Sequence, residues 1–183
     1  MKAINEKLIK AAKVGNTTEL KKLLQKPGCN ALSKAKEGWT ALMHAAYGGQ
    51  EACVRLLLPV SDVLAKAKNG QTALMWAAGF GYEACVRLLL PASDALAKDT
   101  DGWTPLIWAA GAGHEDCLRI LLPVSDVQAR DKKGLTARSS ARLRGNKNVA
   151  QLIDAYALAQ NEQGSIGAAA GPGASSGRLA PRM

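Results

Sequence analysis

Hydrophobic and polar positions recur along this chain every 32 residues. A Gly-X-Thr-(Ala/Pro)-Leu-X-X-Ala-Ala segment begins at Gly38, Gly70 and Gly102, and a degraded copy begins at Gly134. Each of the first three copies is followed by a Cys-(Val/Leu)-Arg-(Leu/Ile)-Leu-Leu-Pro run. A period of this length indicates a stack of similar units rather than a closed globule.

Each unit is predicted to contain two short helices. In residues 70–101, Thr72 is a typical N-cap, and the Gly-Phe-Gly segment at 79–81 ends the first helix. Glu83 opens the second helix, where its charge favours the helix dipole, and Pro91 is expected to stop it. Neither helix can bury its apolar side alone, so each unit needs neighbours.

This pattern resembles the ankyrin repeat, whose family motif runs Gly-X-Thr-Pro-Leu-His-X-Ala-Ala and continues to a Val-Val-X-Leu-Leu-Leu run. The resemblance covers roughly residues 4–160. It implies an all-α solenoid of helix-turn-helix units with hairpin-like connecting loops. The chain departs from the family where Met43, Met75 and Ile107 replace the His, and where Pro59, Pro91 and Pro123 replace the helix-ending Gly.

The positions of the repeated segments predict the boundaries of the repeats and caps. An N-terminal cap repeat and a decayed C-terminal cap repeat flank the full repeats, because polar residues must cover the exposed ends of a stack. After them, the Gly-, Ala- and Ser-rich composition predicts a flexible tail. We expect an ankyrin-repeat domain over 1–160, made of a cap at 1–37, full repeats at 38–69, 70–101 and 102–133 and a cap at 134–160, followed by the tail at 161–183.

The net charge of +9 belongs to the two ends of the chain. Residues 1–36 hold nine Lys and two Glu, whereas residues 37–133 hold nine basic and eleven acidic residues. Charge runs without interleaved aromatic residues are weak binding signals, so we do not expect nucleic acid or a membrane surface as the partner.

Cys53, Cys85 and Cys117 lie on the 32-residue period, and equivalent helices pack too far apart for a disulfide. We therefore expect buried thiols in a reducing compartment. The first residues carry no secretory h-region and no apolar run reaches the length of a membrane span. These features favour a cytoplasmic protein, although export by a non-standard route stays open.

No motif predicts catalysis, a cofactor or a metal. His44 and His114 occupy different positions of different repeats, and no Cys/His cluster has zinc spacing. The Gly-Phe-Gly segment at 79–81 follows a helix rather than a strand, unlike a dinucleotide-binding loop. We therefore expect a non-enzymatic protein without cofactors.

The resemblance implies that partners bind to the hairpin tips and the exposed side of the first helices, the concave face of the family. The positions concerned flank each repeating Gly or lie at the ends of first helices. They are Lys36, Glu37, Trp39, Tyr47, Lys68, Asn69, Gln71, Phe80, Thr100, Asp101, Trp103, Lys132, Lys133 and Leu135.

Tryptophans allow two interpretations. Trp39 and Trp103 are either binding anchors or rings that stiffen the neighbouring hairpin. Trp76 and Trp108 lie inside first helices, where we expect a packing role.

The preferred function is recognition of a partner protein, possibly an acidic one, by a monomer. The alternatives are a basic adaptor for an anionic surface, an effector or scaffold acting on a host protein, and a fragment or recombined stack without its own partner.

Overall fold

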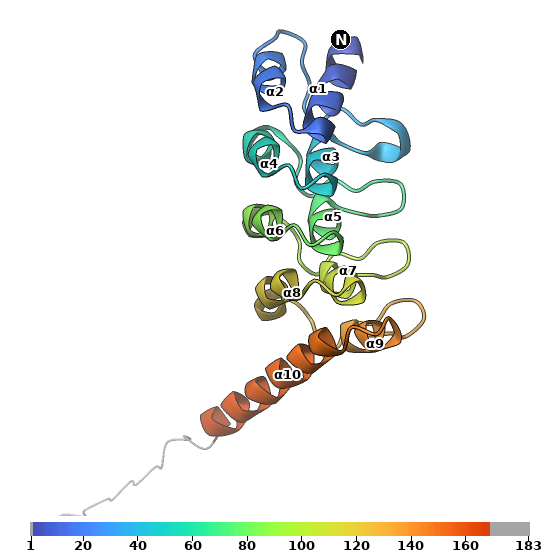
Figure 1. Ribbon diagram of the computed structural model, residues 1–183, viewed down its shortest axis with the longest axis vertical. Helices are drawn as coiled ribbons and strands as arrows, with labels where there is room; N and C mark the ends of the chain where they lie inside the picture. The colour runs from blue at the N-terminus through green and yellow to red at the C-terminus, as the bar shows by residue number, and fades with distance from the viewer. Residues whose placement is uncertain (1, 169–183) are drawn as a thin grey trace, which may run out of the picture.

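The computed structural model describes residues 2–168, with the side chains of residues 2–161, as five stacked helix pairs (Figure 1). No strand is present in this part of the chain. The first helices form one row, the second helices form another, and the connecting loops project on the far side of the first helices. The pairs are α1 (Lys2–Val14) and α2 (Thr17–Leu24), α3 (Ala41–Tyr47) and α4 (Glu51–Leu57), α5 (Ala73–Gly79) and α6 (Glu83–Leu89), α7 (Pro105–Ala112) and α8 (Glu115–Leu121), and α9 (Ala137–Leu143) and α10 (Lys147–Ala168).

Threonine caps start the first helices, as the sequence predicts. The hydroxyl oxygens of Thr40, Thr72 and Thr104 accept hydrogen bonds of 3.2–3.3 Å from the backbone N–H three residues on. Thr136 does the same for α9 and completes a capping box with Ser139. Each cap satisfies one of the N–H groups that a helix start leaves free.

The turn between paired helices requires glycine. Gly81 has a φ of 76°, and a Cβ on it would lie 2.5 Å from His114 Nδ1 of the next repeat. An L-residue is therefore disfavoured twice, by its backbone conformation and by the neighbouring side chain.

The second α-helices of the full repeats end just before their prolines, as the sequence predicts. The chain continues through one-turn 3-10 helices, Leu58–Val60, Leu90–Ala92 and Leu122–Val124, and each holds its proline in the first turn. Proline is tolerated there because that N–H has no partner within the helix. The sequence predicts the end of each α-helix but not the 3-10 turn that follows it.

Small and apolar residues form one continuous core along the stack. Ala45, Ala77 and Ala109 of the first helices have no exposed surface, which lets successive first helices approach closely. Cys53, Cys85 and Cys117 are buried and carry free thiols, as predicted. The all-α solenoid is confirmed.

The connecting loops form a hairpin row, which comprises residues 35–39, 67–71, 99–103 and 131–135. Each hairpin is closed by a backbone bond between its first and last residues, such as Asp99 N to Trp103 O at 3.1 Å. Three bonds of 2.9 Å join successive hairpins: Lys68 N to Glu37 O, Thr100 N to Asn69 O and Lys132 N to Asp101 O. The row therefore extends alongside the first helices.

The end units differ from the full repeats. α1 has 13 residues, whereas α3 has 7. The first unit therefore has additional helix at the position where the next unit has the hairpin before α3. α10 continues to Ala168 and passes the boundary expected after residue 160, where Ala, Gln and Glu favour helix over coil. The rest of the expected tail, residues 169–183, lies outside the described residues.

Candidate functional site

Four aromatic side chains from two adjacent repeats pack against one another beside the hairpin row. We call Trp39, Tyr47, Trp76 and Phe80 the aromatic cluster. Ring centroids lie 4.6 Å apart for Trp39–Trp76 and for Tyr47–Phe80, and 5.3 Å apart for Tyr47–Trp76. These separations are typical of favourable tilted and edge-to-face pairs, each worth about 0.5–1.5 kcal/mol beyond burial.

The row of rings continues into the third full repeat. Trp76 lies 5.8 Å from Trp108, which lies 5.2 Å from Trp103. The guanidinium of Arg144 covers the Trp103 ring at 4.9 Å, within cation–π range. Aromatic contacts thus link the hairpins and first helices of three repeats.

Two aspartates fix the rings at the C-terminal part of this row. Asp131 Oδ2 accepts a 3.1 Å bond from Trp103 Nε1, and Asp99 Oδ2 accepts a 3.0 Å bond from Trp108 Nε1. The other carboxylate oxygen of each aspartate accepts two N–H groups of its own hairpin. Trp103 therefore stiffens the neighbouring hairpin, one of its two predicted roles.

The aromatic cluster lacks these aspartates. Ala67 stands one 32-residue step before Asp99, and Trp76 Nε1 is buried without an acceptor among the described residues. No hydrogen bond joins Trp39 Nε1 to another described side chain. Packing alone positions these two rings.

The aromatic cluster also reaches the surface. Tyr47 and Phe80 are 37% and 41% exposed, and Trp39 and Trp76 are half-buried. Sequence reasoning assigned Trp76 and Trp108 to helix packing and did not include them in the binding face. Their ring contacts agree with that packing role and also bring them against Trp39 and Trp103, a contact that the 32-residue spacing of Trp76 and Trp108 could have indicated.

The hairpin tips are exposed, as expected of a binding face. This holds for Lys36, Glu37, Lys68, Asn69, Thr100, Asp101, Lys132 and Lys133. Trp103 and Leu135 are half-buried. Gln71 departs from the expectation: it is buried, and its Oε1 accepts a hydrogen bond from Asn69 Nδ2. Its side chain closes its own hairpin and has little surface to offer a partner.

A hollow of about 330 Å³ adjoins the aromatic cluster. Its lining comes from the end of α1, the first hairpin and α3, and includes Lys13, Lys36, Trp39, His44 and Tyr47. Burial, and secondly the charge of Lys13, lower the pKa of His44. The imidazole is therefore neutral at pH 7, and its Nδ1 has no hydrogen-bond partner among the described residues.

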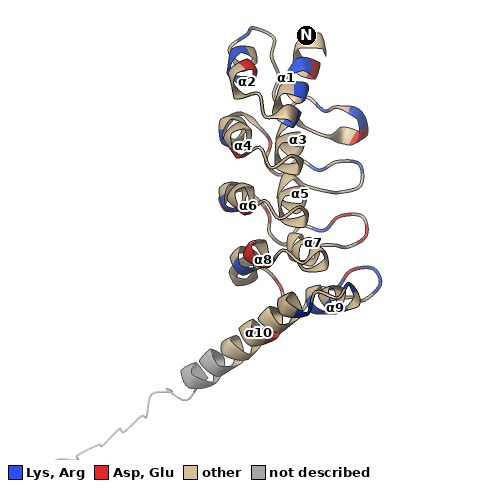
Figure 2. Ribbon diagram, viewed as in Figure 1, with Lys and Arg blue, Asp and Glu red and all other residues tan. Residues whose placement is uncertain are grey.

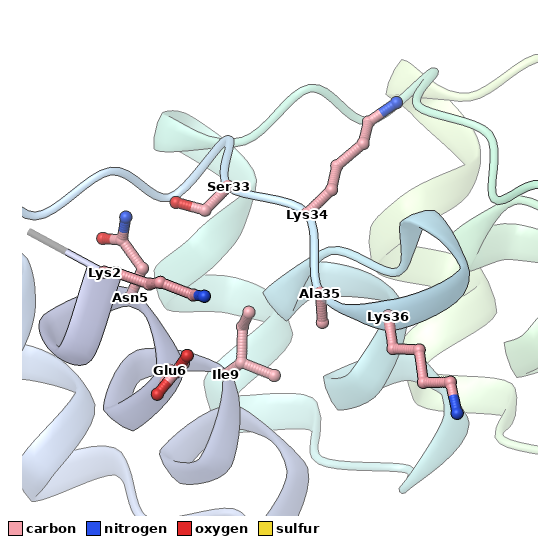
Figure 3. A pocket seen from close by; sticks show the side chains of 8 residues that line it. All are labelled: Lys2, Asn5, Glu6, Ile9, Ser33, Lys34, Ala35 and Lys36. Atoms are coloured by element: carbon pink, nitrogen blue, oxygen red, sulfur yellow. The ribbon is translucent and has the colours of Figure 1, made fainter.

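A second hollow, of about 550 Å³, lies where α1 replaces a hairpin (Figure 3). Lys2, Glu6 and Ile9 of α1 face Ser33 to Lys36 of the first loop. Its lining contains no aromatic ring. It is the space between α1 and the first loop, at the N-terminal end of the hairpin row.

Charge is distributed unevenly along the stack (Figure 2). Lys and Arg gather on α1 and α2 and again on α9. On the second helices, Arg55, Arg87 and Arg119 pair with Glu51, Glu83 and Glu115. The second helices of the full repeats are therefore largely neutralised, and at the C-terminal end Arg138 and Arg142 pair with Asp154.

Metal-ligating groups and cysteine thiols are the next candidates among the described residues. No group of three or more His, Cys, Asp and Glu side chains is placed to hold a metal within this part of the chain. Burial raises the pKa of Cys85 and Cys117 to about 11, which suppresses the reactive thiolate. A search of residues 2–168 for a helix long and apolar enough to cross a membrane found none.

The stacked helix pairs and the hairpin row beside them define a helical repeat protein. The family model for ankyrin repeats matches residues 8–99 and 92–162, so the chain belongs to the ankyrin repeat family. Curated proteins gave no match.

Proposed function

We propose that this protein is a non-enzymatic module that binds another protein through its hairpin row and first helices. Ankyrin repeats are in general protein–protein interaction modules. The aromatic cluster carries the proposal, because exposed rings on a rigid surface are the usual centres of binding energy. The rings already pack against one another, so binding orders little on this side of the interface.

The partner is proposed to be acidic. Lys36, Lys68, Lys132 and Lys133 are exposed along the hairpin row, where they speed the approach of an acidic surface. Glu37 lies 3.6 Å from Lys68 Nζ and offsets part of that charge. The protein is proposed to act as a monomer, which light scattering tests against a mass of 19.2 kDa.

The test compares variants in affinity capture from lysate, read out by quantitative mass spectrometry. Trp39→Ala and Phe80→Ala each remove one ring of the aromatic cluster. Val60→Ala is the matched control, since Val60 is an exposed apolar residue on the 3-10 turn after α4. We expect one set of proteins to be lost with both ring variants and retained with the control.

Thermal unfolding separates binding from folding in this test. Trp39→Ala removes no hydrogen bond to an aspartate, whereas Trp103→Ala removes the donor to Asp131 Oδ2. Trp39→Ala is therefore expected to change the melting temperature less than Trp103→Ala. Capture that is equal for wild type, Trp39→Ala and Phe80→Ala would contradict the proposal.

A second candidate function is binding to an anionic surface through the basic end. Lys7, Lys10, Lys21 and Lys22 are exposed and form no ion pairs with the side chains of residues 2–161. Sedimentation with vesicles containing phosphatidylserine tests this function. Binding through lysines weakens steeply between about 50 and 200 mM salt, whereas binding through the aromatic cluster depends on salt much less.

A further inference from the structure

The hollow beside the aromatic cluster combines two kinds of chemistry. Trp39 and Tyr47 supply aromatic lining, and Lys13 and Lys36 supply basic lining. Three separate elements supply these groups: the end of α1, the first hairpin and α3. The first and second repeats must therefore be stacked for the hollow to exist.

Positive charge in this hollow is not neutralised. Neither Lys13 nor Lys36 forms an ion pair with a side chain of residues 2–161. Glu37, the carboxylate of the lining, lies 3.6 Å from Lys68 Nζ. The neutral His44 ring lies 4.9 Å from the Trp39 ring and adds no charge. The hollow favours an anion.

The aromatic lining is continuous with the aromatic cluster. Trp39 contacts Trp76 at 4.6 Å, and Tyr47 contacts Phe80 at 4.6 Å. A chain that places a carboxylate in the hollow can therefore lay a neighbouring apolar side chain across exposed rings. An isolated anion would gain little, because exposed charge pairs are screened by salt and contribute little to binding.

We propose that the hollow receives an Asp or Glu side chain of the partner, and that a Phe or Leu within a few residues of it packs on the aromatic cluster. This inference rests on the proposed function and narrows its partner to segments that carry both features. The second hollow has lysines but no ring, so it lacks half of this chemistry.

The probes are capped nonapeptides with one Glu and one Phe, separated by one to four residues, in a Gly-Ser background. Tryptophan fluorescence of the full chain reports binding, because Trp39 forms part of the lining. Matched peptides replace Glu by Gln or Phe by Ala. We expect each replacement to weaken the best peptide by at least about fivefold.

Protein variants locate the carboxylate. Lys13→Gln and Lys36→Gln are expected to weaken the Glu peptide by about two- to fivefold each and to leave the Gln peptide unchanged. Lys21→Gln is the matched control, since Lys21 is an exposed lysine on α2 that does not line the hollow. The control variant is expected to bind like wild type.

Histidine NMR gives a second, independent measurement. The chain has two histidines, and only His44 lines the hollow. The bound carboxylate should raise the pKa of His44, which Lys13 and burial lower in the free protein. Lys36 and Glu37 of the first hairpin are the other charged groups of the lining. The His44 resonances should shift with the Glu peptide more than with the Gln peptide, and His114 serves as the internal control.

The outcomes separate this inference from the proposed function. If Phe80→Ala abolishes binding while Lys13→Gln and Lys36→Gln bind both peptides like wild type, the carboxylate site is wrong and the binding face stands. If Lys21→Gln weakens binding as much as Lys13→Gln, attraction belongs to the whole basic end and the site is wrong. If no peptide binds, the inference is overturned, whereas the proposed function is decided by the capture experiment.

Discussion

Ala67 occupies a position where the next two repeats carry aspartates that organise their hairpins. Because of this alanine, Trp76 Nε1 is buried without an acceptor among the described residues. We predict that Ala67→Asp stabilises the protein by about 1 kcal/mol, since a buried donor gains its hydrogen bond. Urea unfolding followed by circular dichroism measures the gain.

A double-mutant cycle identifies the source of that gain. In a Trp76→Phe background the indole donor is absent, and Ala67→Asp should gain less. Equal gains in both backgrounds would show that the aspartate acts on its own hairpin and not on the indole. A loss of stability in wild type would mean that burying the carboxylate outweighs both effects.

Removing Asp131 tests the same interaction in the opposite direction. Its carboxylate accepts three N–H groups, from Lys133, Leu135 and the Trp103 indole. Asp131→Ala is predicted to cost about 2–3 kcal/mol, because several donors lose their acceptor together. Asp126→Ala is the control, since Asp126 Oδ1 accepts from Gln128 N in an exposed turn. Similar losses for the two variants in urea unfolding would contradict this role.

His44 makes stability depend on pH. Burial first, and the charge of Lys13 second, lower its pKa below the ordinary value of about 6.5. The unfolded chain binds the proton more readily, so this contribution is present above that value and is lost as the pH falls below it. Urea unfolding at pH 7.5 and 5.5 should show a larger loss for wild type than for His44→Gln. An equal loss would assign the pH dependence to other groups.

At the scale of elements, the helix starts were predictable because one residue decides each of them. A Thr at the same position of four units accepts the N–H three residues on, whatever the rest of the stack does. The 3-10 turns after the second helices were not predictable, since a proline stops an α-helix but is allowed in the first turn of a 3-10 helix. The length of α10 was also missed, because composition alone cannot place the end of a terminal helix.

The first hairpin contains a strained residue. Glu37 has a φ of 60°, and no other non-glycine residue within 2–168 has a positive φ. A left-handed conformation costs an ordinary L-residue about 1–2 kcal/mol and costs Asn less. Glu37→Asn is therefore predicted to stabilise the protein by about 0.5–1 kcal/mol in urea unfolding. Glu37→Gln keeps the strain and should show no gain, and a gain as large as that of the Asn variant would refute the explanation.

At the scale of the whole molecule, the 32-residue period was enough to predict a stack of repeats. It was not enough to predict the side-chain contacts between repeats that form the aromatic cluster and the hollow. Trp39 and Trp76 lie 37 residues apart in the sequence, and their rings meet because successive repeats are superimposed. The hollow was not predictable either, since Lys13 reaches it from a cap helix whose length departs from the repeat. Contacts within one unit follow from sequence, whereas contacts between units depend on the rise and twist of the stack.

The reactivity of the buried cysteines in the three full repeats reports how often each repeat opens by local unfolding. Cys53, Cys85 and Cys117 occupy one equivalent position on α4, α6 and α8, each at most 1% exposed. An alkylating reagent can reach each thiol only after its own repeat opens. The reaction is the same for all three thiols, so differences in labelling rate report differences in how often each repeat opens. A repeat in the middle of a stack has neighbours on both sides, and we predict that Cys85 is labelled most slowly.

Pulsed alkylation read by peptide mass spectrometry would test this order in the unmodified chain. Cys29, half-buried in the first loop, should react first. Three equal rates for the buried thiols would mean that the stack opens as one unit. Slower labelling of Cys85 than of Cys53 and Cys117 would mean that the end repeats open while the central repeat is still folded. The hollow needs α1 to be docked against α3, so it would then be lost before the central repeat unfolds.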